Sequence, residues 1–204
     1  MQSNFFSRRT LLLVVLTGLA LTLVLLFYFV PKSSIQSGSA PPIENAVVLP
    51  SQEQVSAGLP TRLKISGLNV DSAVEYVGLA PDGSMDVPKD PNDVAWFNLG
   101  PRPGEIGSAV IAGHYGWRKD ARSSVFDNLY TLRKGDKVYI EDDKGVVISF
   151  VVRESRRYEP KADASNVFGS QDGKSHLNLV TCEGVWDKVS KSYSKRLVVF
   201  TDKE

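Results

Sequence analysis

The sequence has very few of the residues that build disulfide scaffolds and metal centres. Its 204 residues include one cysteine, Cys182, and two histidines, His114 and His176. A single cysteine excludes an internal disulfide framework and a C-x-x-C zinc site. Because the two histidines are 62 positions apart, a His/Cys metal site is disfavoured, and we expect neither a required metal nor a cofactor.

The sequence also lacks an excess of charge of either sign. Its 24 lysine and arginine residues are nearly balanced by 23 aspartate and glutamate residues. A protein that binds nucleic acid through its phosphates carries a basic surplus. We therefore expect no nucleic-acid partner.

One segment lacks charge altogether. Residues 11–30 are rich in Leu, Val and Phe, and this run is long enough to cross a bilayer as a helix. Because Arg8 and Arg9 precede it, residues 1–10 are expected in the cytoplasm and the remaining chain outside the cell. A signal peptide cleaved near Ala40 is the alternative, but the run exceeds the roughly 7–15 residues of a signal core. We expect a retained, single-pass anchor in the cell membrane.

Regular patterning is missing from residues 31–58, which are rich in Ser, Pro, Gln and Gly and predict a flexible extracellular linker. Residues 59–204 instead show short alternating segments separated by turns, which predict one domain of about eight strands. Closure protects strand edges, so an all-β closed barrel with short helices is the expected fold. Strands are expected near 63–65, 68–70, 108–114, 137–141, 146–153, 177–182 and 195–201, short helices at 71–79 and 125–132, and irregular chain over 88–104 and 158–175.

The cysteine stands where a strand pattern stops. The alternation around Leu177 and Leu179 ends at Cys182, and a polar connection of about a dozen residues leads to a strand that opens with Arg196. A thiol and a guanidinium are therefore expected to face each other across one loop. A lone cysteine is often a small buried hydrophobe. In an exported chain, beside polar residues and at a strand end, a reactive thiol is favoured.

His114 also falls at the end of a predicted strand, and with Cys182 and Arg196 it forms a set that suits acyl transfer. A thiol attacks a carbonyl as thiolate, so it needs a neighbour that removes its proton. A histidine does this and later protonates a leaving amine. A guanidinium stabilises the oxyanion that develops.

The sequence segments around these residues resemble the His, Cys and Arg motifs of sortases. They are P-G-E-I-G-S-A-V-I-A-G-H at 103–114, L-N-L-V-T-C at 177–182 and K-R-L-V-V-F at 195–200. The resemblance implies a sortase β-barrel and a cysteine transpeptidase of the bacterial surface. Such an enzyme cleaves an LPxTG-like sorting signal of surface proteins through a thioacyl-enzyme and transfers the protein to an amine of a cell-wall precursor. Carried over by motif, Cys182 is the nucleophile, His114 the general acid/base and Arg196 the oxyanion or substrate-positioning group, with Thr181 supporting the oxyanion.

The chain departs from the family pattern at Asn178, where sortases usually have Thr, so the subclass stays open. No second apolar span and no lid motif are evident in the sequence, which favours a single-anchor form over a pilin-polymerising one. Asp90, Asp93 and Glu105 could suggest the calcium site of some sortases, but acids scattered in a Pro-rich loop are more often solvated. His176 is expected at the surface.

Two other functions compete with this interpretation. An L,D-transpeptidase-like enzyme that cross-links peptidoglycan would also use Cys, His and Arg, but it places its His and Cys close together in sequence. A non-catalytic, membrane-tethered binding module would leave the thiol without a function. Labelling of the thiol that a peptide substrate abolishes would distinguish this module from either enzyme.

Overall fold

The computed structural model describes residues 57–116 and 123–204. The expected anchor at 11–30 and nearly all of the expected linker lie outside this range. Within the described residues, no helix has the length and apolar character needed to cross a membrane.

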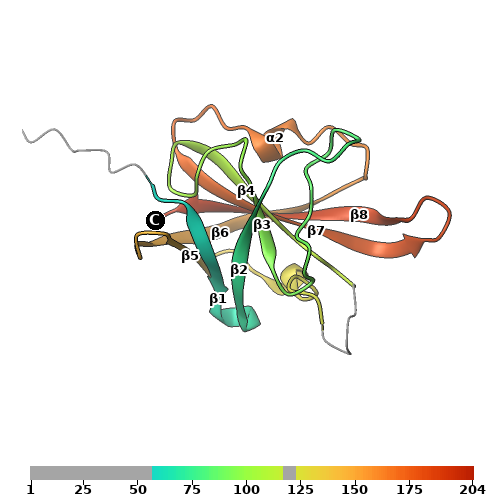
Figure 1. Cartoon of the computed structure of the whole chain (residues 1–204), viewed down its shortest axis with the longest axis horizontal. Coiled ribbons are helices and arrows are strands. Elements are labelled where there is room, and N and C mark those ends of the chain that lie inside the picture. Colours follow the sequence, from blue (N-terminus) through green and yellow to red (C-terminus); the bar gives the residue numbers. More distant parts are fainter. Residues whose placement is uncertain (1–56, 117–122) are drawn as a thin grey trace, which may run out of the picture. The chain divides into compact units, whose positions relative to one another are not determined.

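The described residues form eight strands that close into a barrel in the order β1-β2-β3-β4-β7-β8-β6-β5 (Figure 1). The β2–β3 and β4–β7 pairs are parallel, and all other neighbours are antiparallel. The strands are β1 (Pro60–Ile65), β2 (Val70–Val77), β3 (Val94–Phe97), β4 (Gly107–Gly113), β5 (Lys137–Asp142), β6 (Val147–Tyr158), β7 (Ser175–Asp187) and β8 (Ser192–Lys203), with short helices η1 (Ser66–Leu68), η2 (Leu129–Thr131) and α2 (Ser165–Phe168). The expected all-β closed barrel with short helices is confirmed.

Alternate side chains of each strand fill the interior of the barrel, as the two-residue period of a strand requires. Leu177 and Leu179 of β7 and Leu197 and Val199 of β8 are buried in this interior cluster. A second cluster lies on the outside, where Val110, Val198 and Phe200 pack under Val167 of α2. Strands β4, β7 and β8 are therefore covered on both faces near α2, and their outer faces carry the features described below.

Several local expectations were wrong. Residues 71–79 form most of β2 rather than a helix, because they pair with β1 and β3 on either side. The crossing at 88–104 contains β3, whose apolar sequence pairs in parallel with β2 and antiparallel with β4. The expected helix at 125–132 is only the 3-10 turn η2, and α2 interrupts the expected loop at 158–175.

Candidate active site

Cys182 lies within a long strand rather than at its end. β7 continues to Asp187 and β8 already begins at Ser192, so both strands extend past the barrel as a hairpin (Figure 1). The extension of β7 is largely exposed, and its apolar residues Val185 and Trp186 are adjacent, so the sequence shows no apolar alternation there. Cys182 is the direct antiparallel partner of Arg196. The expectation that they face each other across a loop is corrected: they are neighbours across a strand pair.

The outer row of β7, which we define as His176, Asn178, Val180 and Cys182, points away from the barrel interior because its members alternate with the buried Leu177, Leu179 and Thr181. Val180 pairs with Ala112 of β4 on one side and with Val198 of β8 on the other. Moving two residues along each strand from Ala112, Val180 and Val198 leads to His114, Cys182 and Arg196. The register of three adjacent strands thus brings the three predicted residues to the same end of one outer face.

His114 is held by a backbone carbonyl from another part of the chain. Its Nε2 lies 2.7 Å from the carbonyl oxygen of Pro88. A carbonyl only accepts hydrogen bonds, so Nε2 carries the hydrogen of this contact. The backbone of β4 packs closely against Phe126 just before His114. A Cβ on Gly113 would lie 2.4 Å from a ring carbon of Phe126, so only glycine fits there.

Thr181 links the strand of the thiol to the strand of the histidine. Its buried hydroxyl donates to the carbonyl oxygen of Gly113, at 2.8 Å, directly before His114. The hydroxyl hydrogen is therefore engaged within the protein. This contact fixes the backbone before His114 relative to the backbone before Cys182.

Arg196 is oriented by the hairpin. Nη1 donates to the carbonyl oxygens of Tyr193 and Lys195, each at 3.0 Å, and Nη2 donates to Oγ of Ser192 at 3.0 Å. A guanidinium has five N–H donors. Among the described residues, Nε–H and the second hydrogen of Nη2 have no acceptor, so two donors remain for a ligand.

A structural ion pair of Arg196 with Glu183 or Asp187 was the alternative role, and the geometry does not support it. Glu183 forms a bidentate pair with Arg157, and Asp187 accepts from the backbone N–H of Val189. Within the described part of the chain, no carboxylate pairs with Arg196. Arg196 instead lines the groove beside Cys182.

The electrostatic environment of Cys182 favours the neutral thiol. Burial raises the pKa of the thiol above its ordinary value, and the positive charge of Arg196 partly opposes this rise. The thiol is consequently protonated at neutral pH. Attack on a carbonyl then requires a base that removes the proton when substrate is bound.

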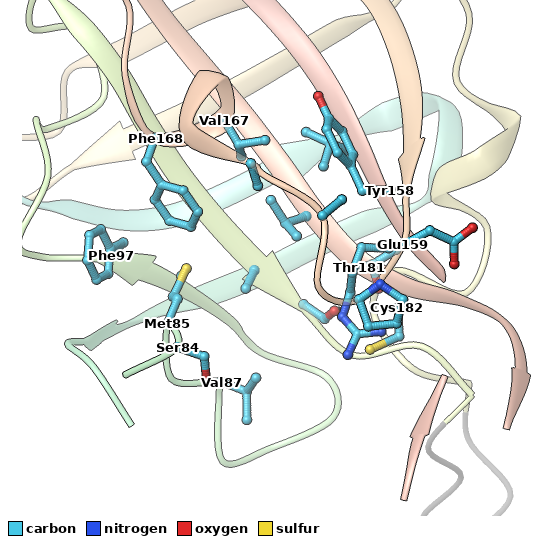
Figure 2. Close-up of a pocket in the computed structure, with 18 of the residues that line it drawn as sticks. Ser84, Met85, Val87, Phe97, Tyr158, Glu159, Val167, Phe168, Thr181 and Cys182 are labelled. Atoms are coloured by element: carbon cyan, nitrogen blue, oxygen red, sulfur yellow. Dashed lines mark hydrogen bonds between the residues drawn. The ribbon is translucent and has the colours of Figure 1, made fainter. Parts of the chain in front are cut away.

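A groove of about 490 Å³ begins at these residues and continues along the outer face of the barrel. Figure 2 shows Cys182 and Thr181 at one end and Phe97, Met85 and Phe168 at the other. The rings of Phe97 and Phe168 meet edge to face, with centroids 5.5 Å apart. The walls are largely apolar, which suits an extended peptide with hydrophobic side chains. The lining also includes His114, Arg196, Leu79, Val87, Ala112, Tyr158, Ala164, Val167, Val180 and Val198.

Sequence reasoning named the residues at one end of this groove but missed its apolar walls. They come from the β2–β3 connection, from β3, and from the β6–β7 connection (residues 159–174) with α2. The available signal was weak: Met85 and Val87 are single apolar residues in a polar segment, and Val167 and Phe168 form one short apolar pair in another. Pro88 was also missed, because it contributes only a backbone oxygen.

The acidic residues considered for calcium do not form one cluster. Burial and the nearby carboxylates of Asp90 and Glu75 raise the pKa of Asp93, whereas Glu105 accepts from the backbone N–H of Arg102 at 2.8 Å. Among residues 57–116 and 123–204, no group of three His, Cys, Asp or Glu side chains has metal-binding geometry.

The expectation that His176 is a surface residue is wrong. Its side chain is 4% exposed and contacts the carboxylates of Asp172 and Asp202. It lies in the barrel wall, beneath the β6–β7 connection.

Comparisons with known proteins agree with this geometry. The family model described as a sortase domain matches residues 63–204, and no curated protein matches the sequence. A solved complex of Streptococcus agalactiae sortase C1 with MTSET is 24% identical, over 70% of this chain and 66% of that chain, with a TM-score of 0.54. Sortase A from Corynebacterium diphtheriae is 19% identical, over 72% and 60%, with a TM-score of 0.54. The Clostridium perfringens sortase D5 transpeptidase is 21% identical, over 71% and 78%, with a TM-score of 0.52.

At these identities the structural likeness shows the fold alone, and the chain spans less than two thirds of the first two structures. The sortase-domain match is broader, because it covers well over half of the chain and includes all three motif residues.

Proposed function

The chain belongs to the sortase family, and from that premise we propose that it is a cysteine transpeptidase. It would cleave an LPxTG-like sorting signal of surface proteins and transfer the acyl part to an amine of a cell-wall precursor. The single observation that carries this proposal is the cross-strand pair of Cys182 and Arg196, with His114 level with them at the end of an apolar groove.

In the first half-reaction, Sγ of Cys182 attacks the carbonyl carbon of the scissile peptide bond while the thiol proton passes to Nδ1 of His114. The carbonyl oxygen becomes an oxyanion, and the free N–H donors of Arg196 face it. The C–N bond then breaks, and His114 returns the proton to the leaving amine. A thioester on Cys182 remains.

In the second half-reaction, the acceptor amine attacks the thioester carbonyl and gives up a proton to His114. The C–S bond breaks, the new amide forms, and the thiolate of Cys182 recovers the proton. Thr181 supports both steps as a positioning residue, because its hydroxyl fixes the peptide before His114 relative to Cys182.

The proposed reaction predicts a covalent adduct at one site. Incubating the protein with a panel of sorting-signal peptides, peptidoglycan stem peptides and amines should yield an acyl adduct on Cys182, followed by an amide product, both read by mass spectrometry. Adducts from stem peptides alone would favour the L,D-transpeptidase-like alternative. Thiol labelling that no peptide suppresses, with no adduct, would favour the binding module.

We also propose that residues 11–30 remain in the mature protein as a single-pass anchor, with residues 59–204 outside the cell. The length of the uncharged run and the arginines before it support this topology. N-terminal sequencing of the protein recovered from membranes should therefore begin at or near residue 1. A start near Pro41 would contradict the anchor.

A further inference from the structure

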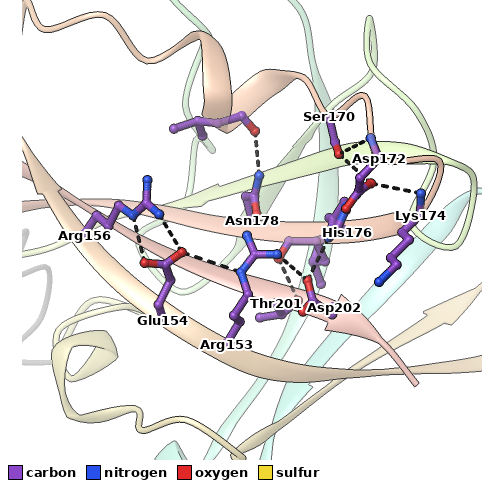
Figure 3. A network of polar contacts seen from close by, with 12 residues as sticks. Arg153, Glu154, Arg156, Ser170, Asp172, Lys174, His176, Asn178, Thr201 and Asp202 are labelled. Atoms are coloured by element: carbon purple, nitrogen blue, oxygen red, sulfur yellow. Dashed lines mark hydrogen bonds and ion pairs between the residues drawn. The ribbon is translucent and has the colours of Figure 1, made fainter.

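The outer row of β7 is polar at the end opposite to the thiol. Val180 and Cys182 line the groove, whereas His176 and Asn178 lie beneath the β6–β7 connection and are 4% and 1% exposed. Buried polar side chains of this kind are costly unless they are bonded. Their bonds lead to the connection that covers them (Figure 3).

His176 joins the connection to the barrel through two carboxylates. Its Nδ1 lies 2.8 Å from Asp202 of β8, and its Nε2 lies 3.0 Å from Asp172 of the connection. Each ring nitrogen of His176 thus has a carboxylate oxygen within hydrogen-bond distance, one from the barrel and one from the connection.

Further polar contacts hold the two carboxylates that bond to His176. Arg153 of β6 donates to Asp202 at 2.7 Å and also pairs with Glu154. Asp172 accepts further bonds from Oγ of Ser170 and the backbone N–H of Lys174. The bond from His176 and these local bonds lower the pKa of Asp172 below its ordinary value. Asp172 is therefore ionised at neutral pH and available to hold His176.

Asn178 provides a second attachment one step closer to the thiol. Its Nδ2 donates to the carbonyl oxygen of Val167 in α2 at 2.6 Å. Its Oδ1 is buried and has no partner among the described residues. The bond to α2 is therefore the side-chain hydrogen bond that Asn178 makes within the described residues.

The segment held by these bonds is also a wall of the groove. Val167, whose carbonyl is bound by Asn178, lines the groove with its side chain, and Phe168 meets Phe97 across it. Helix α2 is only four residues long, which is too short to be stable without external contacts. Its place therefore depends on the outer cluster and on the bonds from β7.

We propose that His176 and Asn178 clamp the β6–β7 connection to the barrel and thereby set the affinity of the groove for the acyl-donor peptide. They are positioning residues that act through Asp172 and Val167 and do not touch the reacting atoms. The inference rests on the proposed function, since it names what determines donor binding at the same site. The groove binds the peptide only while its wall is in place. If the wall is in place for a smaller fraction of the time, the apparent affinity for the peptide falls by the same factor.

The test uses the full-length chain with Asp172→Ala and Asn178→Ala, singly and combined. Asp172 is exposed, so its loss removes one attachment without opening the core. Asp71→Ala is the matched control, because it removes a carboxylate that pairs with Arg62 between β1 and β2, away from the groove. Each protein is compared for amide hydrogen exchange over residues 159–174 and for KM and kcat with a sorting-signal peptide.

We expect exchange in 159–174 to accelerate on the order of tenfold in each single variant. KM should rise about fivefold or more, most strongly in the combined variant, with kcat within about twofold. Asp71→Ala should change neither quantity. His176→Gln added to Asp172→Ala should raise KM little further, because both remove the same attachment.

If amide exchange in 159–174 is unchanged in the variants, His176 and Asn178 do not hold the connection in place. If exchange is faster but KM stays at the wild-type value, their hold on the connection does not set the affinity for the peptide. A fall in kcat with constant KM would place these residues in the chemistry and also overturn the proposal. If the wild-type protein cleaves no sorting peptide, the proposed function fails. The exchange measurement still decides whether the clamp exists.

Discussion

Replacing Cys182 by alanine should abolish the thioacyl intermediate, and replacing His114 by alanine should lower turnover on the order of 10²–10⁴-fold. The thiol of Cys182 is buried enough that its pKa lies above the ordinary value. It is therefore protonated at neutral pH, and in the proposed mechanism His114 removes its proton. Single-turnover mass spectrometry should detect the acyl adduct in the wild-type protein and not in Cys182→Ala.

His176→Gln is a matched control for His114→Ala, because it replaces the other histidine while leaving the reactive end of the groove intact. It should keep kcat near the wild-type value even though its KM rises. Near-full turnover in His114→Ala would show that another group is the acid and base. The bond between His114 and Pro88 would then be structural.

Replacing Arg196 by either lysine or alanine should lower the rate of peptide cleavage on the order of 10²–10³-fold, the usual effect of losing one oxyanion donor. A planar guanidinium offers two N–H donors at once, and an ammonium cannot reproduce that fork despite its charge. The two substitutions should differ in their effect on the thiol. Arg196 opposes the rise in the pKa of Cys182, so alkylation of Cys182 should shift to higher pH in Arg196→Ala and shift less in Arg196→Lys.

Arg157→Ala is the control, since it removes a neighbouring arginine that pairs with Glu183 instead of facing the groove. It should change cleavage little. Within residues 57–116 and 123–204, the side chain of Arg196 donates hydrogen bonds only to the β7–β8 hairpin, so thermal melting of its variants should stay near that of the wild type. Lowered melting with near-normal turnover would mean that Arg196 supports the fold rather than the reaction.

Much of this architecture is evident in the sequence because it depends on local pattern. The alternation around Leu177, Leu179 and the last strand places buried and outer side chains correctly, since a strand reverses its faces at every residue. The motif residues His114, Cys182 and Arg196 are recognisable because the residues around each of them form a specific sequence motif. The many short strands separated by turns were sufficient to predict a closed barrel.

The tertiary structure decided what depends on partners distant in sequence. Residues 71–79 became a strand because β1 and β3 flank them, and β7 continued past Cys182 because β8 pairs with it in an exposed hairpin. The backbone hydrogen bonds of a strand are made to the strands beside it. The sequence of the strand itself therefore indicates only weakly where the strand ends. Local periodicity therefore misplaced these boundaries.

The groove illustrates the same limit at the level of function. His114, Cys182 and Arg196 meet because the parallel β4–β7 pair and the antiparallel β7–β8 pair have a particular register. His176 and Asn178 are buried because a connection folds over them and supplies a carboxylate and a carbonyl. The sequence alone determined which residues we propose to carry the chemistry. Only tertiary packing decided which walls surround them and what holds those walls, because these contacts join segments that are far apart along the chain.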